Sequence, residues 1–149
     1  MPLDTSPKGK AYPAQSYEIG SEKVREYAQA VGEDNPIYYE RDAAREAGFR
    51  DIPAPPMFAV VYSWRAIAQT AVDPELGMDL ARLLHAGQEF AWGEPACAGD
   101  TISTEASVKE VYPRGDNAFY VFETVSRNQD GQEVARGTWT NIVRGGAAE

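Results

Sequence analysis

The longest apolar segment of the chain predicts a buried helix. Residues 57–72 are apolar on nearly every helical face, and only a few polar side chains interrupt them. Such a distribution is typical of a helix that is covered on most sides. The segment begins directly after Pro55 and Pro56, which suit a first helical turn, and it stops before Asp73 and Pro74. Both boundaries of the predicted helix therefore have a physical cause.

After this helix the pattern becomes typical of β-strands. Turn signals rich in Gly, Pro, Asn and Asp separate the segments, and residues 128–131 form a good hairpin connection. The predicted strands are residues 83–92, 101–112, 118–128 and 133–143. Both alternating faces of the third strand are apolar, which predicts one face against the helix and the other against a partner. The pattern favours the α+β class, with an antiparallel sheet wrapped around one long hydrophobic helix.

Shorter elements are predicted before the central helix. Residues 17–19 alternate like a strand, and residues 40–47 predict a short helix. Residues 52–56 are expected to be extended, because a residue that precedes proline avoids the helical region. Another helix is predicted to have Ser21 as its N-cap and to end at Gly32. The face of that helix expected to be buried consists of Val24, Tyr27, Ala28 and Val31.

The length of the chain, 149 residues, suits one domain that buries roughly two-thirds of its extended surface. We therefore expect a single domain over residues 1–149. Residues 1–15 carry three prolines and show no periodicity, which predicts an arm over the domain surface, with Tyr12 placed to pin it. Residues 145–149 are expected to form a flexible tail.

The composition limits the partners and cofactors to be expected. Asp and Glu total 23 against 14 Lys and Arg, and the resulting net charge of −9 argues against binding to nucleic acid or to anionic membranes. No run of the sequence reaches the roughly 20 apolar residues that cross a bilayer, and no targeting segment is expected. With one cysteine, Cys97, and one histidine, His85, neither a disulfide nor a zinc site is expected. We expect a cytoplasmic protein without a metal or other cofactor.

Residues 27–57 carry the most informative motif. Its matching positions are Gly32, Asn35, Pro36, Ile37, Ala44, Gly48, Phe49, Ala54 and Met57. Their spacing resembles the MaoC-like (R)-specific hydratase family, which reads G-D-x-N-P-I-H-x-D, then A-x-x-x-G-F, then I-A-x-G-M, and which has the hot-dog fold. Over residues 17–143 the chain is also similar to the FAS1-type dehydratase N-terminal domain. It looks like the non-catalytic subunit of heterodimeric (3R)-hydroxyacyl-ACP dehydratases.

The resemblance implies reversible hydration of a 2-enoyl thioester to a (3R)-hydroxyacyl thioester, on coenzyme A (CoA) or acyl carrier protein (ACP). In the family, an Asp and a His hold a water and shuttle its proton, while a helix N-terminal N–H polarises the thioester carbonyl. Here Glu33 aligns with the Asp, Tyr38 with the His, and Pro56 with the glycine that carries the N–H. A phenol has an ordinary pKa of about 10, whereas imidazole has a pKa of about 6.5. A phenol is therefore a poorer proton shuttle than imidazole at neutral pH. The departures favour a degenerate site.

Further candidates lie around these positions. Because proline has no N–H, the donor to the thioester oxygen would be Met57 or Phe58. Asp34 and Asn35 are interpreted first as turn formers and second as substrate-binding residues. His85 is the only imidazole, so an imidazole step within the chain would use it; alternatively, it hydrogen-bonds a loop carbonyl. The candidate catalytic residues are Glu33, Tyr38 and His85, and the candidate substrate-binding residues are Asp34, Asn35, Pro56, Met57 and Phe58.

Three hypotheses follow for the function. In the first, the chain is a degenerate subunit of a (3R)-hydroxyacyl-thioester dehydratase that pairs with a catalytic hot-dog paralogue. In the second, it is a self-sufficient homodimeric hydro-lyase that uses Glu33, Tyr38 or His85. In the third, it binds an acyl group or another small molecule without catalysis. The ligand in the first two hypotheses is an acyl-CoA or acyl-ACP, and in the third an acyl group or another small molecule. We expect the protein to dimerise and to bind this ligand in a tunnel between the protomers.

Overall fold

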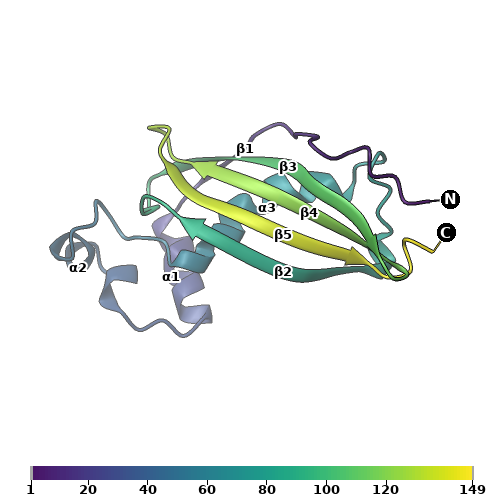
Figure 1. Ribbon diagram of the computed structural model, residues 1–149. Coiled ribbons are helices and arrows are strands. Elements are labelled where there is room, and N and C mark those ends of the chain that lie inside the picture. The colour runs from purple at the N-terminus through teal and green to yellow at the C-terminus, as the bar shows by residue number, and fades with distance from the viewer. Residues whose placement is uncertain (1, 149) are drawn as a thin grey trace.

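The computed structural model describes residues 2–148, in which five antiparallel strands form one sheet with the order β1-β3-β4-β5-β2. The strands are β1 (Gln15–Glu18), β2 (Leu83–Trp92), β3 (Thr101–Arg114), β4 (Asn117–Arg127) and β5 (Glu133–Val143). Figure 1 shows these strands as one curved layer with helix α3 (Ala59–Ala71) behind it. The predicted α+β class, with a sheet around one central helix, is confirmed.

Helix α3 is held against the sheet by a nearly continuous buried face. The buried residues are Ala59, Tyr62, Ser63, Ala66, Ile67 and Thr70. Two of the three hydroxyl groups in this set are satisfied within the helix, because Ser63 donates to the Ala59 carbonyl and Thr70 Oγ1 donates to the Ile67 carbonyl at 2.7 Å. Ser63 and Thr70 are therefore buried with their hydroxyl groups paired.

The start of the central helix differs slightly from the prediction. Residues 56–58 form a tighter 3₁₀ turn, η2 (Pro56–Phe58), before α3 begins. The Phe58 N–H donates to the Pro55 carbonyl at 2.8 Å, three residues back, as 3₁₀ geometry requires. Pro56 itself has no N–H to place in this turn.

A segment rich in short helices lies beside one end of the sheet, at the left of Figure 1. It contains α1 (Ser21–Ala30), η1 (Pro36–Tyr38) and α2 (Arg41–Glu46). We call the part of this segment that follows α1, residues 31–55, the overhang. The prediction that Val31 is buried with the α1 face is wrong, because its side chain is 54% exposed. The helix ends at Ala30, before Val31. The predicted capping role of Ser21 is also wrong, because Ser21 is the first helical residue and Gly20 occupies the N-cap position without a side-chain hydrogen bond.

The connection between β3 and β4 is shorter than the predicted loop at residues 113–117. Pro113 and Arg114 are still paired in the sheet, opposite Ala118 and Asn117. The turn consists of two residues, and Gly115 has a φ of +59°. Glycine at that position of a tight hairpin is favoured because it carries no Cβ. The strands therefore extend further than the turn residues alone indicated.

Two hydrophobic clusters form the core along α3. One lies at the start of the helix and includes Phe58 and Tyr62, and the other lies at its end and includes Ile67 and Trp139. Phe90, on the edge strand β2, packs against both clusters. The central helix and the inner face of the sheet are thus joined over their whole length, which positions the site described below.

The N-terminal arm lies along the outer edge of β3 and is held by backbone and side-chain hydrogen bonds. The Gly9 N–H donates to the Val108 carbonyl at 2.8 Å, and the Tyr12 hydroxyl donates to Asp73 at 2.6 Å. At the other terminus, the Ala147 N–H donates to the Asp116 carbonyl at 3.0 Å. Met1 of the expected arm and Glu149 of the expected tail lie outside the described residues.

Candidate functional site

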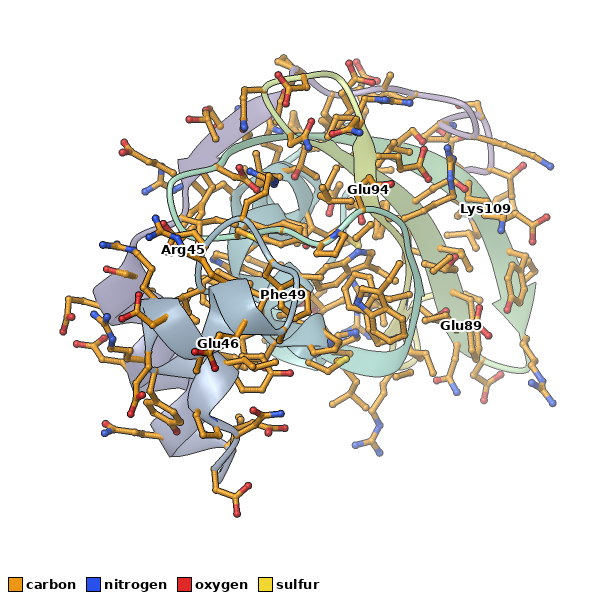
Figure 2. The ribbon with its side chains drawn as sticks, turned by 90° about the vertical axis from the view of Figure 1, so that its left-hand side faces the viewer. Arg45, Glu46, Phe49, Glu89, Glu94 and Lys109 are labelled. Carbon is orange, nitrogen blue, oxygen red and sulfur yellow. The ribbon has the colours of Figure 1, made fainter. Side chains whose placement is uncertain are left out.

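A cavity of about 210 Å³ lies where the overhang meets the start of α3. Figure 2 looks onto this end of the molecule, with Phe49 on the overhang and Glu94 on the segment after β2. The lining is mostly apolar: Ile37, Tyr38, Phe49, Pro53, Ala54, Pro55, Pro56, Tyr62, Trp92, Gly93, Glu94, Pro95, Ala96 and Val134. A small apolar cavity with a few polar groups is typical of a small-molecule site.

Tyr38 reaches this cavity from η1, whose geometry is set by the residue before it. The Asn35 side chain caps the turn by accepting a hydrogen bond from the Ile37 N–H at 3.2 Å, which is the turn-forming role expected for it. Burial, followed by the nearby charge of Glu33, raises the pKa of Tyr38. The Tyr38 phenol therefore stays protonated at neutral pH.

Glu33 and Asp34 lie on the exposed part of the overhang. The carbonyl of Glu33 accepts a hydrogen bond from the Tyr39 hydroxyl, which fixes the backbone there. Glu33 is close enough to Tyr38 to influence its pKa, but its carboxylate is not part of the cavity lining described above. The structure thus brings Tyr38 and Pro56 together in one cavity and leaves Glu33 at its outside.

The helix start, where a thioester carbonyl would be polarised, is shaped by its prolines. The Phe58 N–H is engaged by Pro55, and the Pro56 carbonyl accepts a hydrogen bond from the Trp92 indole at 2.9 Å. Met57 remains the candidate donor from the sequence, and its side chain is 45% exposed. This hydrogen bond joins the end of β2 to the turn that precedes α3.

His85 lies in a different cavity, of about 170 Å³, between the end of α3 and the start of β2. Its ring stacks on Trp139, with the ring centres 5.5 Å apart. Its Nε2 lies 3.0 Å from the Gly87 carbonyl, next to the irregularity in the pairing of β2 with β5 between His85 and Gly87. Contact with a carbonyl is the alternative that the sequence left open for this histidine, and the structure places the ring apart from Tyr38.

Glu94 is a residue of the first cavity that sequence reasoning missed. It is the one carboxylate among the residues that line the cavity. In the sequence it lies between Gly93 and Pro95, where it indicated only a turn. Its place in the cavity was not predictable from the local sequence, because it depends on pairing with β5: the Gly93 N–H donates to the Val134 carbonyl and the Glu94 N–H donates to the Glu133 carbonyl.

An ion pair between the exposed Arg50 and the buried Asp100 joins the loops near this cavity. Arg50 donates to both oxygens of Asp100 at 2.9 Å, and Gln129 donates to the same carboxylate at 3.0 Å. The Cys97 N–H adds a fourth hydrogen bond at 2.9 Å. Burial alone would raise the pKa of Asp100, but these donors outweigh it and the pKa is lowered. We call these residues the Asp100 clamp; it joins the overhang, the segment after β2 and the β4–β5 hairpin.

Two further searches bear on the expected absences. Within residues 2–148, no helix is long and apolar enough to cross a membrane. Over the same described residues, no cluster of three or more His, Cys, Asp or Glu side chains is arranged to hold a metal ion.

Comparison with known proteins agrees with the geometry. A family model described as FAS1-like, dehydratase domain region, matches residues 6–137. A UPF0336 protein of Saccharopolyspora erythraea is 38% identical over 150 residues, which covers 100% of this chain and 96% of that protein.

Solved structures give the same fold. The HadBC (3R-hydroxyacyl-ACP dehydratase) complex from Mycobacterium tuberculosis has a chain that is 25% identical, with a TM-score of 0.76 over 91% of this chain and 96% of that one. A MaoC-like dehydratase is 21% identical, with a TM-score of 0.83 over 93% of this chain and 42% of that one. The hot-dog fold and the MaoC-like resemblance are confirmed.

Proposed function

Because the chain belongs to the family of FAS1-like dehydratase domains, we propose that it is a catalytically degenerate, acyl-binding subunit of a (3R)-hydroxyacyl-thioester dehydratase. Its ligand would be an acyl group carried on CoA or ACP, in cytoplasmic fatty-acid metabolism. One observation carries the proposal: the apolar cavity at the start of α3 is intact, while Tyr38 lines it at the position of the family's histidine.

The proton chemistry of dehydration requires a group that gains and loses a proton near neutral pH. The raised pKa of Tyr38 removes it from that role, and Glu33 lies on the exposed side of the overhang. Tyr38 is still able to donate a hydrogen bond to a thioester or hydroxyl oxygen in the cavity. We therefore assign acyl binding to this chain and the acid–base step to a partner.

The free edge of the sheet supports such a partner. Figure 1 shows β2 at one side of the sheet, and no strand of the described chain pairs with its outer edge. The Gln88 carboxamide oxygen on β2 is buried without a hydrogen-bond partner in residues 2–148. Leu84 and Trp92, also on β2, are 50% and 53% exposed. Unpaired strand edges with apolar side chains favour association, here with a catalytic hot-dog paralogue or, alternatively, with a second copy.

The catalytic part of the proposal is tested by following crotonyl-CoA hydration as loss of the enoyl-thioester absorbance. We expect no turnover by the purified chain alone, and turnover when a hot-dog paralogue with an intact Asp–His pair is added. The variants Glu33→Gln, Tyr38→Phe, His85→Ala and Glu94→Gln are assayed beside it. Robust turnover by the chain alone, abolished by one of these changes, would instead establish a self-sufficient hydro-lyase.

Glu94 supports the second candidate function, a self-sufficient hydro-lyase. It is the carboxylate that shares the first cavity with Tyr38, so a general base is present in principle. If Glu94→Gln abolishes turnover by the chain alone while Glu33→Gln does not, the second function is correct and Glu94 is its base.

The binding part of the proposal is tested separately from turnover. Ala54 lines the cavity and is half-buried, so Ala54→Leu fills space that the acyl group needs. We expect crotonyl-CoA binding, measured by calorimetry, to weaken at least about tenfold, because the acyl group then buries less of its apolar surface in the cavity. Ala11→Leu, at an exposed position of the arm, is the matched control. Equal binding by both variants contradicts the assignment of the cavity.

A further inference from the structure

Tyr62 lies near the start of α3 and is a buried wall of the first cavity. Its side chain is 3% exposed, and it is one of the residues that line the cavity. Its ring packs on Phe58, four residues earlier, with ring centres 6.3 Å apart. Helical side chains are tilted toward the helix N-terminus and cover the preceding turn. The Tyr62 ring therefore covers the turn that contains Pro56.

The hydroxyl group of Tyr62 has no hydrogen-bond partner within residues 2–148. Buried tyrosine hydroxyls ordinarily have a partner. The other buried hydroxyl groups of the described chain all make hydrogen bonds, and they belong to Ser63, Thr70, Thr104, Tyr120, Thr124 and Ser126. Tyr62 is thus the exception among them, and it is the one of these residues that lines the first cavity. A ligand in the cavity is positioned to complete its hydrogen bonding.

The other donors of the cavity wall differ from Tyr62 in place or in availability. Three lining side chains carry a donor, namely Tyr38, Tyr62 and Trp92. The Trp92 indole N–H is already engaged by the Pro56 carbonyl. Tyr38 comes from the overhang, whereas Tyr62 comes from α3, the helix at whose start the aligned N–H is missing. Tyr62 is therefore the free side-chain donor that α3 itself contributes to the cavity.

The environment of Tyr62 suits a neutral donor. Burial raises the pKa of its phenol, so the group keeps its proton at neutral pH. The packing on Phe58 and the burial of the ring hold the hydroxyl in place before a ligand arrives. A donor that is already positioned loses little conformational freedom when it binds an acceptor.

We propose that the Tyr62 hydroxyl donates a hydrogen bond to the thioester carbonyl oxygen of the bound acyl group, and that it replaces the backbone N–H that Pro56 cannot supply. The inference rests on the proposed function and adds the residue that recognises the carbonyl group. It accounts for both unusual features of the helix start, the proline without an N–H and the buried hydroxyl without a partner.

The test compares two ligands that differ only at the carbonyl group. Butyryl-CoA has the thioester carbonyl, and S-butyl-CoA has a methylene group in its place. Tyr62→Phe removes the hydroxyl and keeps the ring. We expect this change to weaken butyryl-CoA binding to the full chain about 3–10-fold in calorimetry, the effect of one neutral hydrogen bond, and to leave S-butyl-CoA binding unchanged.

A spectroscopic readout reports the same hydrogen bond directly. Butyryl-CoA labelled with ¹³C at the carbonyl is bound to the full chain and to Tyr62→Phe, and the carbonyl band is measured by infrared difference spectroscopy. A hydrogen bond weakens the C=O bond, so the band should lie at lower frequency in the full chain than in the variant. Equal frequencies contradict the proposal.

Two tyrosine variants serve as controls. Tyr120 is also buried, but its hydroxyl donates to the Leu76 carbonyl at 3.3 Å in the other core cluster, so Tyr120→Phe should leave the preference for butyryl-CoA over S-butyl-CoA unchanged. Tyr38→Phe removes the other free phenol of the cavity. A carbonyl-dependent loss with Tyr38→Phe and none with Tyr62→Phe would assign the donor to Tyr38 and overturn the proposal.

The stability of Tyr62→Phe separates a binding role from a structural one. A buried hydroxyl without a partner does not stabilise the fold, so the midpoint of urea unfolding should stay the same or rise. A lower midpoint together with unchanged butyryl-CoA binding would show that the hydroxyl has a structural role, and the proposal would be wrong.

The failure of this inference differs from the failure of the proposed function. If butyryl-CoA binds the full chain but Tyr62→Phe weakens both ligands equally, or neither, the assignment of Tyr62 is refuted while the proposed function stands. If neither ligand binds the full chain or any variant, the proposed function itself fails.

Discussion

Replacing Asp100 by Asn tests whether the Asp100 clamp holds the walls of the cavity together through its charge. The side chain of Asp100 is only 2% exposed, whereas that of Arg50 is 57% exposed. Asn keeps the size of Asp and removes the charge. It also turns one acceptor into a donor, which then faces the donors of Arg50 and Gln129.

The expected loss of stability follows from this geometry. Removing one partner of a fully buried ion pair costs about 3–5 kcal/mol. Because Arg50 is more than half exposed, water screens part of the interaction, and we expect about 2–3 kcal/mol for Asp100→Asn. For a chain of this size that corresponds to a fall in Tm of about 4–12 °C. Asp130→Asn, an exposed change on the neighbouring hairpin, should cost less than about 0.5 kcal/mol.

The pH dependence separates charge from shape. The pKa of Asp100 is lowered in the folded state, so its carboxylate stabilises the fold above its unfolded pKa, near about 3.9, and this contribution is lost as the pH falls through the folded pKa. Urea unfolding at pH 7 and at successively lower pH values measures it. The difference between the protein and Asp100→Asn should be constant at neutral pH and shrink below about pH 4. A difference that is unchanged at acid pH would refute the ionised clamp.

Two further predictions concern the arm and the sheet. Tyr12→Phe removes the hydroxyl that donates to Asp73 at 2.6 Å and should cost about 1 kcal/mol, with faster amide exchange at Gly9; unchanged exchange would contradict the pinning role. Gly137→Ala places a Cβ within 2.6 Å of the Thr124 hydroxyl and should cost about 1–3 kcal/mol by overpacking. Its control, Gly87→Ala, meets its nearest neighbour at 3.5 Å, and similar losses for both would show that packing is not the cause.

The elements were predictable where a local pattern determines them. The central helix is apolar on most faces and bounded by prolines, and each long strand lies between turn residues, so their positions followed from the sequence alone. Val31 was misplaced because apolar spacing continues past the residue where the helix ends. The β3–β4 turn was drawn too long because Pro113 is tolerated in a strand when its missing N–H is not needed for pairing.

The site was predictable only in part, because it depends on which ends of distant elements meet. The motif identified the overhang and the start of α3, and Tyr38 and Pro56 do share a cavity. Glu94 joins them through the pairing of the segment after β2 with β5, which no local signal in the sequence reports. His85 is separated from them by the length of β2, and its position relative to Tyr38 is a property of the sheet.

The interactions around the cavity preserve its walls rather than a proton-transfer geometry. The Asp100 clamp joins three segments that surround the cavity, and Trp92 ties the end of β2 to Pro56. The hydrogen bonds of Asn35 and Tyr39 fix the overhang backbone near Glu33 and orient no imidazole or buried carboxylate toward the cavity. A site that must transfer protons fixes the acid and the base through such contacts. A site that must hold an acyl chain needs stable apolar walls, and the Asp100 clamp and the Trp92 hydrogen bond to Pro56 stabilise these walls.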